Sequence, residues 1–167
     1  RDPVPPVPEL LGPGLRDAVV CVTGAGGSIG SELCRQILQL FPRALILLES
    51  SEPSLYVVDQ ELRQQLPASV ILLPVLGSAA DLVFVQKLFE GNGVQTVFHA
   101  AAYKHVPLVE ANPLAGLANN VGSTRVVCQA AVASGVSEMV LISTDKAVRP
   151  TNVMGASKRL AELVVQA

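Results

Sequence analysis

Long hydrophobic runs are absent from this sequence, although half of its 167 residues are hydrophobic. No stretch approaches the roughly 18 apolar residues that a helix needs to cross a bilayer, and no signal-peptide pattern is recognisable. We therefore expect these residues to work in the cytoplasm. Tryptophan is missing as well, and aromatic residues make up only 4% of the chain, which excludes no class of function.

Charged residues and cysteines are also few. Charged residues amount to 16%, with a net charge of −2, so no surface for nucleic acid or for an anionic membrane is expected. Cys21, Cys34 and Cys128 lack the spacing of metal ligands, and we predict buried, reduced thiols and no metal site. The composition suits a single domain with a sizeable core.

Prolines are concentrated at the start of the chain, where Pro3, Pro5, Pro6, Pro8 and Pro13 stand before Leu15. They prevent a helix or a central strand. Residues 1–17 are therefore predicted to form an extended linker, and residues 18–167 the folded domain. A linker here favours attachment to a preceding segment; a disordered terminus is the alternative.

The sequence does contain a glycine-rich turn between a strand pattern and a helix pattern. The run Val19–Val22 is rich in β-formers, and Gly24, Gly27 and Gly30 follow with the spacing G-x-x-G-x-x-G. Such a turn lets the backbone approach a pyrophosphate, whose charge the helix N-terminus receives. We predict that this turn, with Ser28 and Ile29, binds a dinucleotide. The apolar residues of the helix are expected to share one face (Ile29, Leu33, Ile37 and Leu40).

An acidic residue follows at the distance that a dinucleotide site requires. Glu49 ends the apolar run Ala44–Leu48, about 20 residues after the glycines. A carboxylate there accepts hydrogen bonds from the adenosine ribose and repels a 2′-phosphate, which favours NAD over NADP. Arg63 is the nearest later cation, and nothing in the sequence places it on a phosphate.

Strand and helix patterns alternate along the rest of the chain. Strands are predicted at 44–48, 70–75, 94–98 and 139–142, and helices at 52–66, 81–91, 113–135 and 152–166. This alternation is typical of βαβ units. We predict an α/β fold, a Rossmann-like doubly wound parallel sheet with helices on both faces.

Ligands of such sheets bind beyond the carboxyl ends of the strands. After the fourth strand, three small residues (Ala100, Ala101 and Ala102) leave room for a flat cofactor. Lys104 and His105 follow, and they are candidates for binding a phosphorylated substrate, with a surface position as the alternative for His105. His99 is predicted to be a core histidine at the strand end.

The segment after the fifth strand brings a hydroxyl, an acid and a base together in Thr144, Asp145 and Lys146. Lys158 lies on the last predicted helix, one turn after Met154, so both face the same way. Solvated surface charges are the alternative, but this edge of the sheet favours a catalytic role.

These motifs resemble those of the polysaccharide-biosynthesis nucleotide-sugar 4,6-dehydratases, within the extended short-chain dehydrogenase/reductases. The resemblance is carried by 23–33, 99–107, 120–124, 143–147 and 150–159. It implies conversion of UDP-N-acetylglucosamine, or a relative, to a 4-keto-6-deoxy sugar nucleotide. Hydride passes from C4 to bound NAD and returns to C6. It also implies that Asn120 contributes to cofactor binding.

The same resemblance implies a role for each polar residue after the fifth strand. Lys146 would be the base at C5, and Asp145 the acid for the departing 6-hydroxyl. Thr144 would hydrogen-bond the 4-oxygen, and Lys158 would hold the nicotinamide ribose.

The chain departs from the family at two points. Met154 replaces the catalytic tyrosine of the superfamily, as in the long, membrane-attached members, so Asp145 is also expected to deprotonate the 4-hydroxyl. The substrate-binding lobe is not in the sequence, which predicts little or no turnover by these residues alone. The expected parent is an oligomer tethered to the cytoplasmic face of the inner membrane. A nucleotide-sugar 4-epimerase and a silent NAD-binding module are the alternatives.

Overall fold

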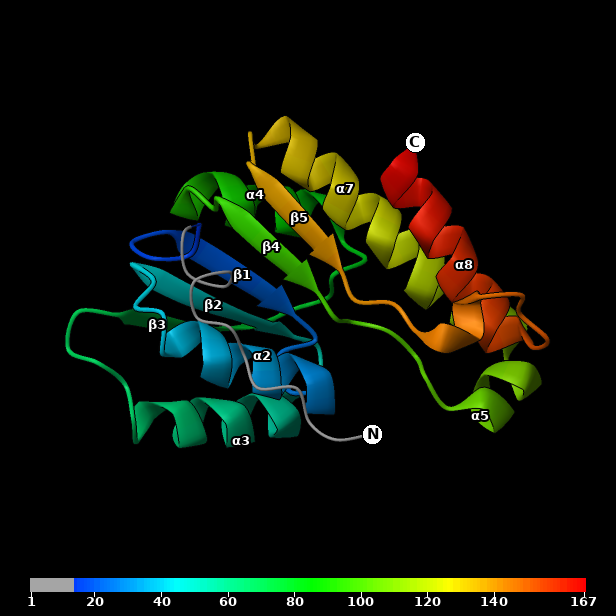
Figure 1. Cartoon of the computed structure of the whole chain (residues 1–167), viewed down its shortest axis with the longest axis horizontal. Coiled ribbons are helices and arrows are strands. Elements are labelled where there is room, and N and C mark those ends of the chain that lie inside the picture. The colour runs from blue at the N-terminus through cyan, green and yellow to red at the C-terminus, as the bar shows by residue number, and fades with distance from the viewer. Residues whose placement is uncertain (1–13) are drawn as a thin grey trace.

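A computed structural model describes residues 14–167, which form one parallel sheet with helices on both faces (Figure 1). Its five strands are ordered β3-β2-β1-β4-β5, and each pair of neighbours is parallel. The strands are β1 (Val19–Thr23), β2 (Ala44–Glu49), β3 (Ile71–Leu76), β4 (Thr96–His99) and β5 (Glu138–Leu141). The predicted fold class is confirmed.

The helices alternate with the strands along the chain. They are α2 (Ser28–Leu38), α3 (Glu52–Arg63), α4 (Leu82–Asn92), α5 (Val106–Ala111), α6 (Pro113–Leu117), α7 (Ser123–Ala133) and α8 (Val153–Gln166). A π-helical turn, η1 (Ala118–Gly122), joins α6 to α7, and a short 3-10 helix, η2 (Asp145–Ala147), follows β5. No helix within residues 14–167 is long and apolar enough to span a membrane.

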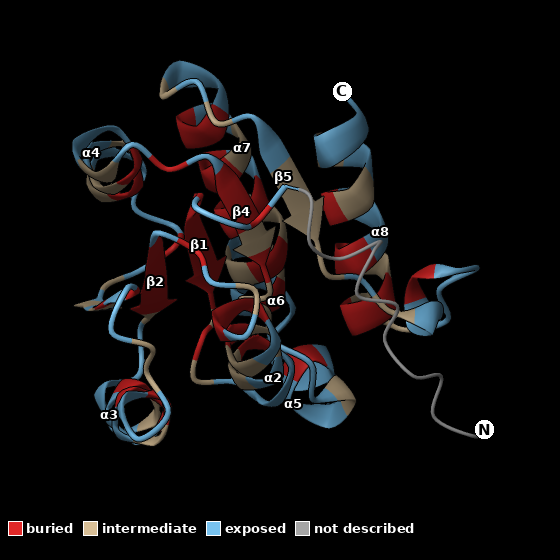
Figure 2. Ribbon diagram, turned by 60° about the vertical axis from the view of Figure 1, so that its left-hand side comes forward, coloured by how far each residue is buried: buried red, intermediate tan, exposed pale blue. Residues whose placement is uncertain are grey.

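Alternation along β1 explains the two helical layers. Val20 and Val22 pack on the face that α2 and α3 cover, and Val19 and Cys21 pack on the face that α4 and α7 cover. Both faces of a strand are buried when helices cover both sides of a parallel sheet. Figure 2 shows this burial in β1, β2 and β4, while β5 is only partly covered.

The order of the strands positions the site. The chain runs from β1 outward to β2 and β3, then returns to β4 on the other side of β1. The loops that follow β1 and β4 therefore diverge onto opposite faces and leave a crevice at the carboxyl ends of the strands. The glycine turn and the alanine segment meet at this crevice.

Two predictions about the helices are corrected. Ile29 does not share the buried face of α2; it is 55% exposed, because Gly30 rather than Ile29 faces the β1 loop. The helix α5 was not predicted, because the sequence patterns place no helix between the fourth strand and residue 113. Proline is well suited to the first turn of a helix, where its missing N–H costs nothing, and Pro107 stands there.

Two further predictions, on the cysteines and on the start of the folded domain, are refined. Cys21 and Cys34 are buried as predicted, whereas Cys128 is only partly buried. Most of the predicted linker, residues 1–17, lies outside the described residues. Residues 14–17 form a turn, and Leu15 is 8% exposed within the core, so the folded part begins before residue 18.

Candidate functional site

The glycine turn fits closely against the segment after β4. Gly24 has a positive φ of 68°, and a Cβ there would lie 2.7 Å from the Ala101 Cα atom. A Cβ on Gly30 would overlap the Gly24 carbonyl oxygen. The helix α2 starts from this turn without a side-chain cap and without an acidic residue in its first turn. Its free N–H groups therefore suit an anion such as a pyrophosphate.

Glu49 is fixed beside the same turn. One carboxylate oxygen accepts a hydrogen bond from the Gly26 N–H at 3.0 Å, and the other accepts from the N–H groups of Ser50 and Ser51 at 2.8 and 3.0 Å. These contacts tie the end of β2 to the glycine turn. A small pocket lined by Glu49, Gly24, Ser78 and other residues lies here, so the residues present fit the adenosine half of a dinucleotide.

A second pocket, of about 430 Å³, lies at the carboxyl ends of β4 and β5. It brings together predicted site residues from both halves of the chain. Its walls are Ile29, Ala100, Ala102, Tyr103, Lys104, His105, Ile142, Ser143, Thr144, Lys146, Met154 and Lys158. We call it the β4–β5 pocket.

Lys158 is the buried cation of the β4–β5 pocket. It is 6% exposed, and its Nζ donates to the Ile142 carbonyl at 2.7 Å. Burial lowers the pKa of Lys158, and the nearby Glu162 carboxylate opposes that effect. Met154 is buried on the same wall, so no phenolic hydroxyl stands at that position.

Lys146 lines the β4–β5 pocket, whereas Asp145 does not. The Asp145 side chain is 92% exposed. It accepts a hydrogen bond from the Thr144 hydroxyl at 3.0 Å and lies 3.9 Å from the Lys146 ammonium. The acid and the base predicted from the sequence are therefore neighbours at the open rim of the pocket.

Lys104 and His105 are both exposed walls of the β4–β5 pocket. The Lys104 ammonium donates to the Ser28 hydroxyl at 3.4 Å. Ser28 is the first residue of α2, so Lys104 reaches across the crevice to the start of the helix that follows the glycine turn.

Asn120 lies behind the alanine segment and is buried. Its amide oxygen accepts from the Tyr103 N–H at 2.7 Å, and its amide nitrogen donates to the Tyr103 carbonyl at 3.0 Å and to the Ser157 hydroxyl at 2.8 Å. The side chain is occupied by protein groups. These contacts hold the segment after β4 against α8, and the cofactor contact predicted for Asn120 stays a prediction.

His99 is a core histidine, as predicted, and is 1% exposed. Its two ring nitrogens lie 2.6 Å from the Thr23 hydroxyl and 3.1 Å from the Thr124 hydroxyl. Burial lowers the pKa of His99 to about 3, and the positive charge of Lys158 contributes. The ring is therefore neutral at pH 7.

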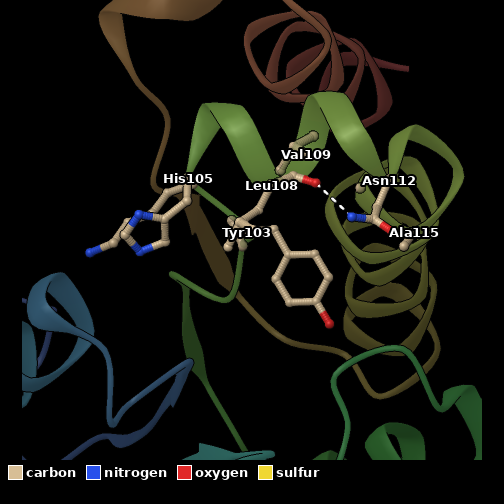
Figure 3. Close-up of a pocket in the computed structure, with 9 residues that line it drawn as sticks. Tyr103, His105, Leu108, Val109, Asn112 and Ala115 are labelled. Atoms are coloured by element: carbon tan, nitrogen blue, oxygen red, sulfur yellow. Dashed lines mark hydrogen bonds between the residues drawn. The ribbon is translucent and has the colours of Figure 1, made fainter.

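Sequence reasoning missed a third pocket, of about 440 Å³, that borders the β4–β5 pocket (Figure 3). Tyr103, Leu108 and Val109 line it, together with Asn112, which lies between α5 and α6, and residues of α6. This pocket could not be predicted because α5, which forms part of its wall, was not predicted. The sequence feature that indicates α5 is Pro107 in its first turn.

Glu110, also on α5, was missed for the same reason. Its carboxylate accepts a hydrogen bond from the Val153 N–H at 2.5 Å. Val153 begins α8, which carries Met154 and Lys158. Glu110 thus joins α5 to the helix that forms one wall of the β4–β5 pocket.

Comparison with known proteins identifies the family. The polysaccharide biosynthesis protein family matches residues 20–167. The chain belongs to this family. The capsular polysaccharide biosynthesis protein CapD of Staphylococcus aureus is 43% identical over 166 residues, which cover 99% of this chain and 28% of that protein.

The names of two more distant relatives each state an enzymatic activity. A UDP-glucose 4-epimerase of Rickettsia canadensis is 33% identical over 147 residues, which cover 87% of this chain and 42% of that protein. The solved structure of DesIV, a dTDP-glucose 4,6-dehydratase of Streptomyces venezuelae with NAD bound, is 26% identical with a TM-score of 0.73. The alignment covers 87% of this chain and 50% of the DesIV chain. The chain therefore spans half or less of the length of these relatives.

Proposed function

We propose that this chain is the NAD-binding part of a nucleotide-sugar 4,6-dehydratase that acts on UDP-N-acetylglucosamine or a close relative. The observation that carries the proposal is the β4–β5 pocket, where Thr144, Lys146 and Lys158 line one cavity beside the glycine turn. Membership of the polysaccharide biosynthesis protein family supports a role in surface polysaccharide synthesis.

NAD is the proposed cofactor. The close fit of Gly24 and Gly30, the uncapped start of α2 and the fixed Glu49 carboxylate suit a dinucleotide. The DesIV dehydratase binds NAD in its crystal structure. NAD supplies a hydride acceptor and donor, and that chemistry belongs to the cofactor.

The residues of the chain supply the acid, the base and the hydrogen bonds. Thr144 donates to the 4-oxygen of the sugar, and Lys158 holds the nicotinamide ribose. Once C4 is a ketone, the proton at C5 is acidic, and Lys146 removes it. Asp145 takes the proton of the 4-hydroxyl as C4 becomes a ketone and gives a proton to the departing 6-hydroxyl, so that water leaves. Lys146 returns a proton to C5 when hydride reaches C6. In these roles the sugar meets Asp145 at the open rim of the pocket, where its carboxylate is exposed.

The proposal extends to the whole protein. Lys104 and His105 are proposed to bind the sugar nucleotide, and the parent is proposed to be an oligomer tethered to the cytoplasmic face of a membrane. The proline-rich residues 1–17 and the similarity to the much longer CapD support this reading.

A nucleotide-sugar 4-epimerase is the second candidate. The Rickettsia canadensis relative carries that name, and the exposure of Asp145 outside the pocket walls favours it. Epimerisation needs hydride transfer out and back but no acid for a departing hydroxyl.

Proton NMR of UDP-N-acetylglucosamine in D2O with NAD separates the candidates. The 167-residue chain and the full-length protein are each tested. We expect the full-length protein to yield a 4-keto-6-deoxy product with deuterium at C5. A 4-epimer without deuterium at C5 would establish the epimerase instead, and no conversion by either chain would leave a silent NAD-binding module.

Two variants sharpen the test. Asp145→Asn and Lys146→Met should each lower dehydratase turnover by at least about 100-fold, because general acid–base catalysis typically contributes that much. Glu90→Gln is the matched control, since Glu90 is exposed on α4. Full activity of Asp145→Asn would remove the dehydratase assignment.

A further inference from the structure

A groove of about 330 Å³ is lined by Gly26 and by residues of α2 and α3. Gly26 donates its N–H to Glu49 and also lines the groove, where Ser54 packs against it so closely that a Cβ on Gly26 would lie 2.5 Å from the Ser54 Cβ. The groove therefore adjoins the carboxylate expected to bind the adenosine ribose.

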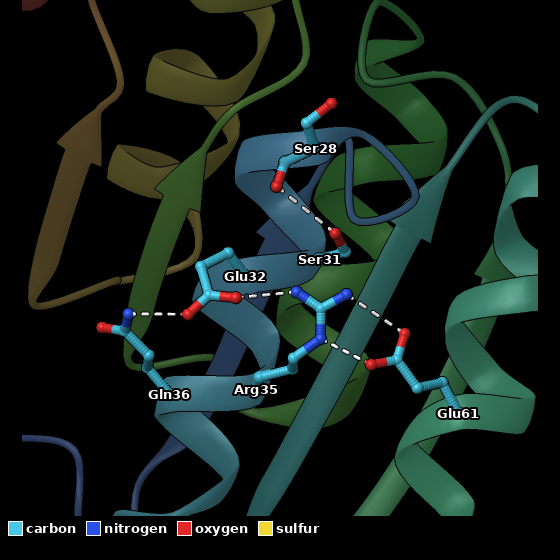
Figure 4. Close-up of polar contacts among 6 residues, drawn as sticks. All are labelled: Ser28, Ser31, Glu32, Arg35, Gln36 and Glu61. Atoms are coloured by element: carbon cyan, nitrogen blue, oxygen red, sulfur yellow. Dashed lines mark hydrogen bonds and ion pairs between the residues drawn. The ribbon is translucent and has the colours of Figure 1, made fainter.

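Arg35 lies in this groove and is held by two carboxylates (Figure 4). Its Nε and one terminal nitrogen donate to the two oxygens of Glu61 at 2.5 and 3.1 Å, and the other terminal nitrogen donates to Glu32 at 2.7 Å. Gln36 donates to the second oxygen of Glu32. The hydrogen bonds that Arg35 donates to Glu61 and Glu32 raise the pKa of Arg35, and the bond that Glu61 accepts lowers the pKa of Glu61.

The charges around the groove oppose a further anion. Two carboxylates, those of Glu32 and Glu61, contact one guanidinium, and the Glu49 carboxylate lies on Gly26, which lines the same groove. In dinucleotide-binding folds a nearby arginine accommodates the 2′-phosphate of NADP. Arg35 stands in the last turn of α2 and shares the groove with Gly26. Its guanidinium is committed to Glu61 in a bidentate pair, which is the strongest geometry for an arginine–carboxylate pair.

We propose that Glu61, by holding Arg35, is a second determinant of the preference for NAD over NADP, in addition to Glu49. The inference rests on the cofactor given under Proposed function. It assigns a specificity role to the pair that links α2 to α3.

The test is the binding of NAD and NADP to the Glu61→Gln variant of the full-length protein, measured by isothermal titration calorimetry. This variant frees the Nε and one terminal nitrogen of Arg35, while Glu32 keeps the other. It should tighten NADP binding by about tenfold, the size expected of one charge-assisted pair, and should leave NAD binding within about twofold. The gain should shrink at high salt, because the pair is partly exposed. Adding Arg35→Leu should abolish it.

The Asp59→Asn variant is the matched control, because Asp59 pairs with Arg63 on the same helix at 2.8 Å but neither lines the groove. An equal NADP gain in this variant would overturn the proposal, since any lost negative charge would then suffice. NAD binding that persists without any NADP gain in Glu61→Gln would overturn it while leaving the cofactor proposal intact. Failure of the wild type to bind NAD would overturn both.

Discussion

His99 illustrates how a single buried residue links the fold to pH. Its ring lies between hydroxyls from β1 and α7, and burial lowers its pKa to about 3. The pKa in the unfolded chain is about 6.5. The stability that the neutral ring contributes is therefore complete above pH 6.5 and is lost as the pH falls from 6.5 toward 3.

We predict that the free energy of unfolding decreases by up to about 1.4 kcal/mol per pH unit over that window. His99→Gln should flatten this dependence and, at pH 7, destabilise the chain by about 1–3 kcal/mol, because buried hydroxyls lose their partner. Urea denaturation between pH 4 and pH 7 measures both effects. His105→Gln is the control, since His105 is exposed and its replacement removes the other histidine without touching the buried contacts of His99. An unchanged slope in His99→Gln would contradict the prediction.

At the scale of the elements, the start of α8 organises the β4–β5 pocket. Glu110 of α5 accepts a hydrogen bond from the N–H of Val153, the first residue of α8. Asn152 caps the same helix by accepting a hydrogen bond from the Gly155 N–H at 2.8 Å. Gly155 also lies against the carbonyl of Lys146, so closely that a Cβ would overlap that oxygen. The absence of a side chain at residue 155 therefore allows η2 to approach α8.

We predict that Gly155→Ala destabilises the chain by about 1–3 kcal/mol, the usual cost of overpacking. Gly91→Ala in α4 should instead stabilise it by up to about 1 kcal/mol, because alanine is the better helix former and a Cβ there meets nothing within 4 Å. Urea unfolding of the two variants measures the contrast. If Gly155→Ala raised the free energy of unfolding, η2 would have to move away from α8 at no cost, which would contradict the prediction.

At the scale of the whole molecule, the proposed cofactor site lies where the strand order reverses, between β1 and β4. The residues of that site come from the loops after β1, β2 and β4. A ligand that joins them should favour the folded state of the entire sheet, since these loops separate when the chain unfolds.

We predict that NAD at about 100 times its dissociation constant stabilises the chain by about 2.7 kcal/mol, which raises the melting temperature by about 5–10 °C for a domain of this size. NADP at the same concentration should raise it less. Differential scanning calorimetry measures the shift. An unchanged melting temperature with NAD would contradict the proposed cofactor site.

The sequence by itself determined the alternation of strands and helices, apart from α5, and it predicted the glycine-turn half of the candidate site. Runs of β-forming and apolar residues identified the five strands. The spacing of Gly24, Gly27 and Gly30 from Glu49 predicted that the glycine turn and Glu49 meet, as the Gly26–Glu49 hydrogen bond shows. Each of these signals is local or lies on adjacent βα units, where short connections and parallel pairing leave few arrangements.

Only the tertiary structure decided which side chains share a cavity. The exposure of Ile29, the position of Asp145 outside the pocket walls and the reach of Lys104 to Ser28 depend on how segments distant in sequence pack. The pairing of Arg35 with Glu61 likewise needs α2 and α3 side by side. Helix periodicity shows which residues share a face, but the neighbour that this face meets is set by packing on the sheet.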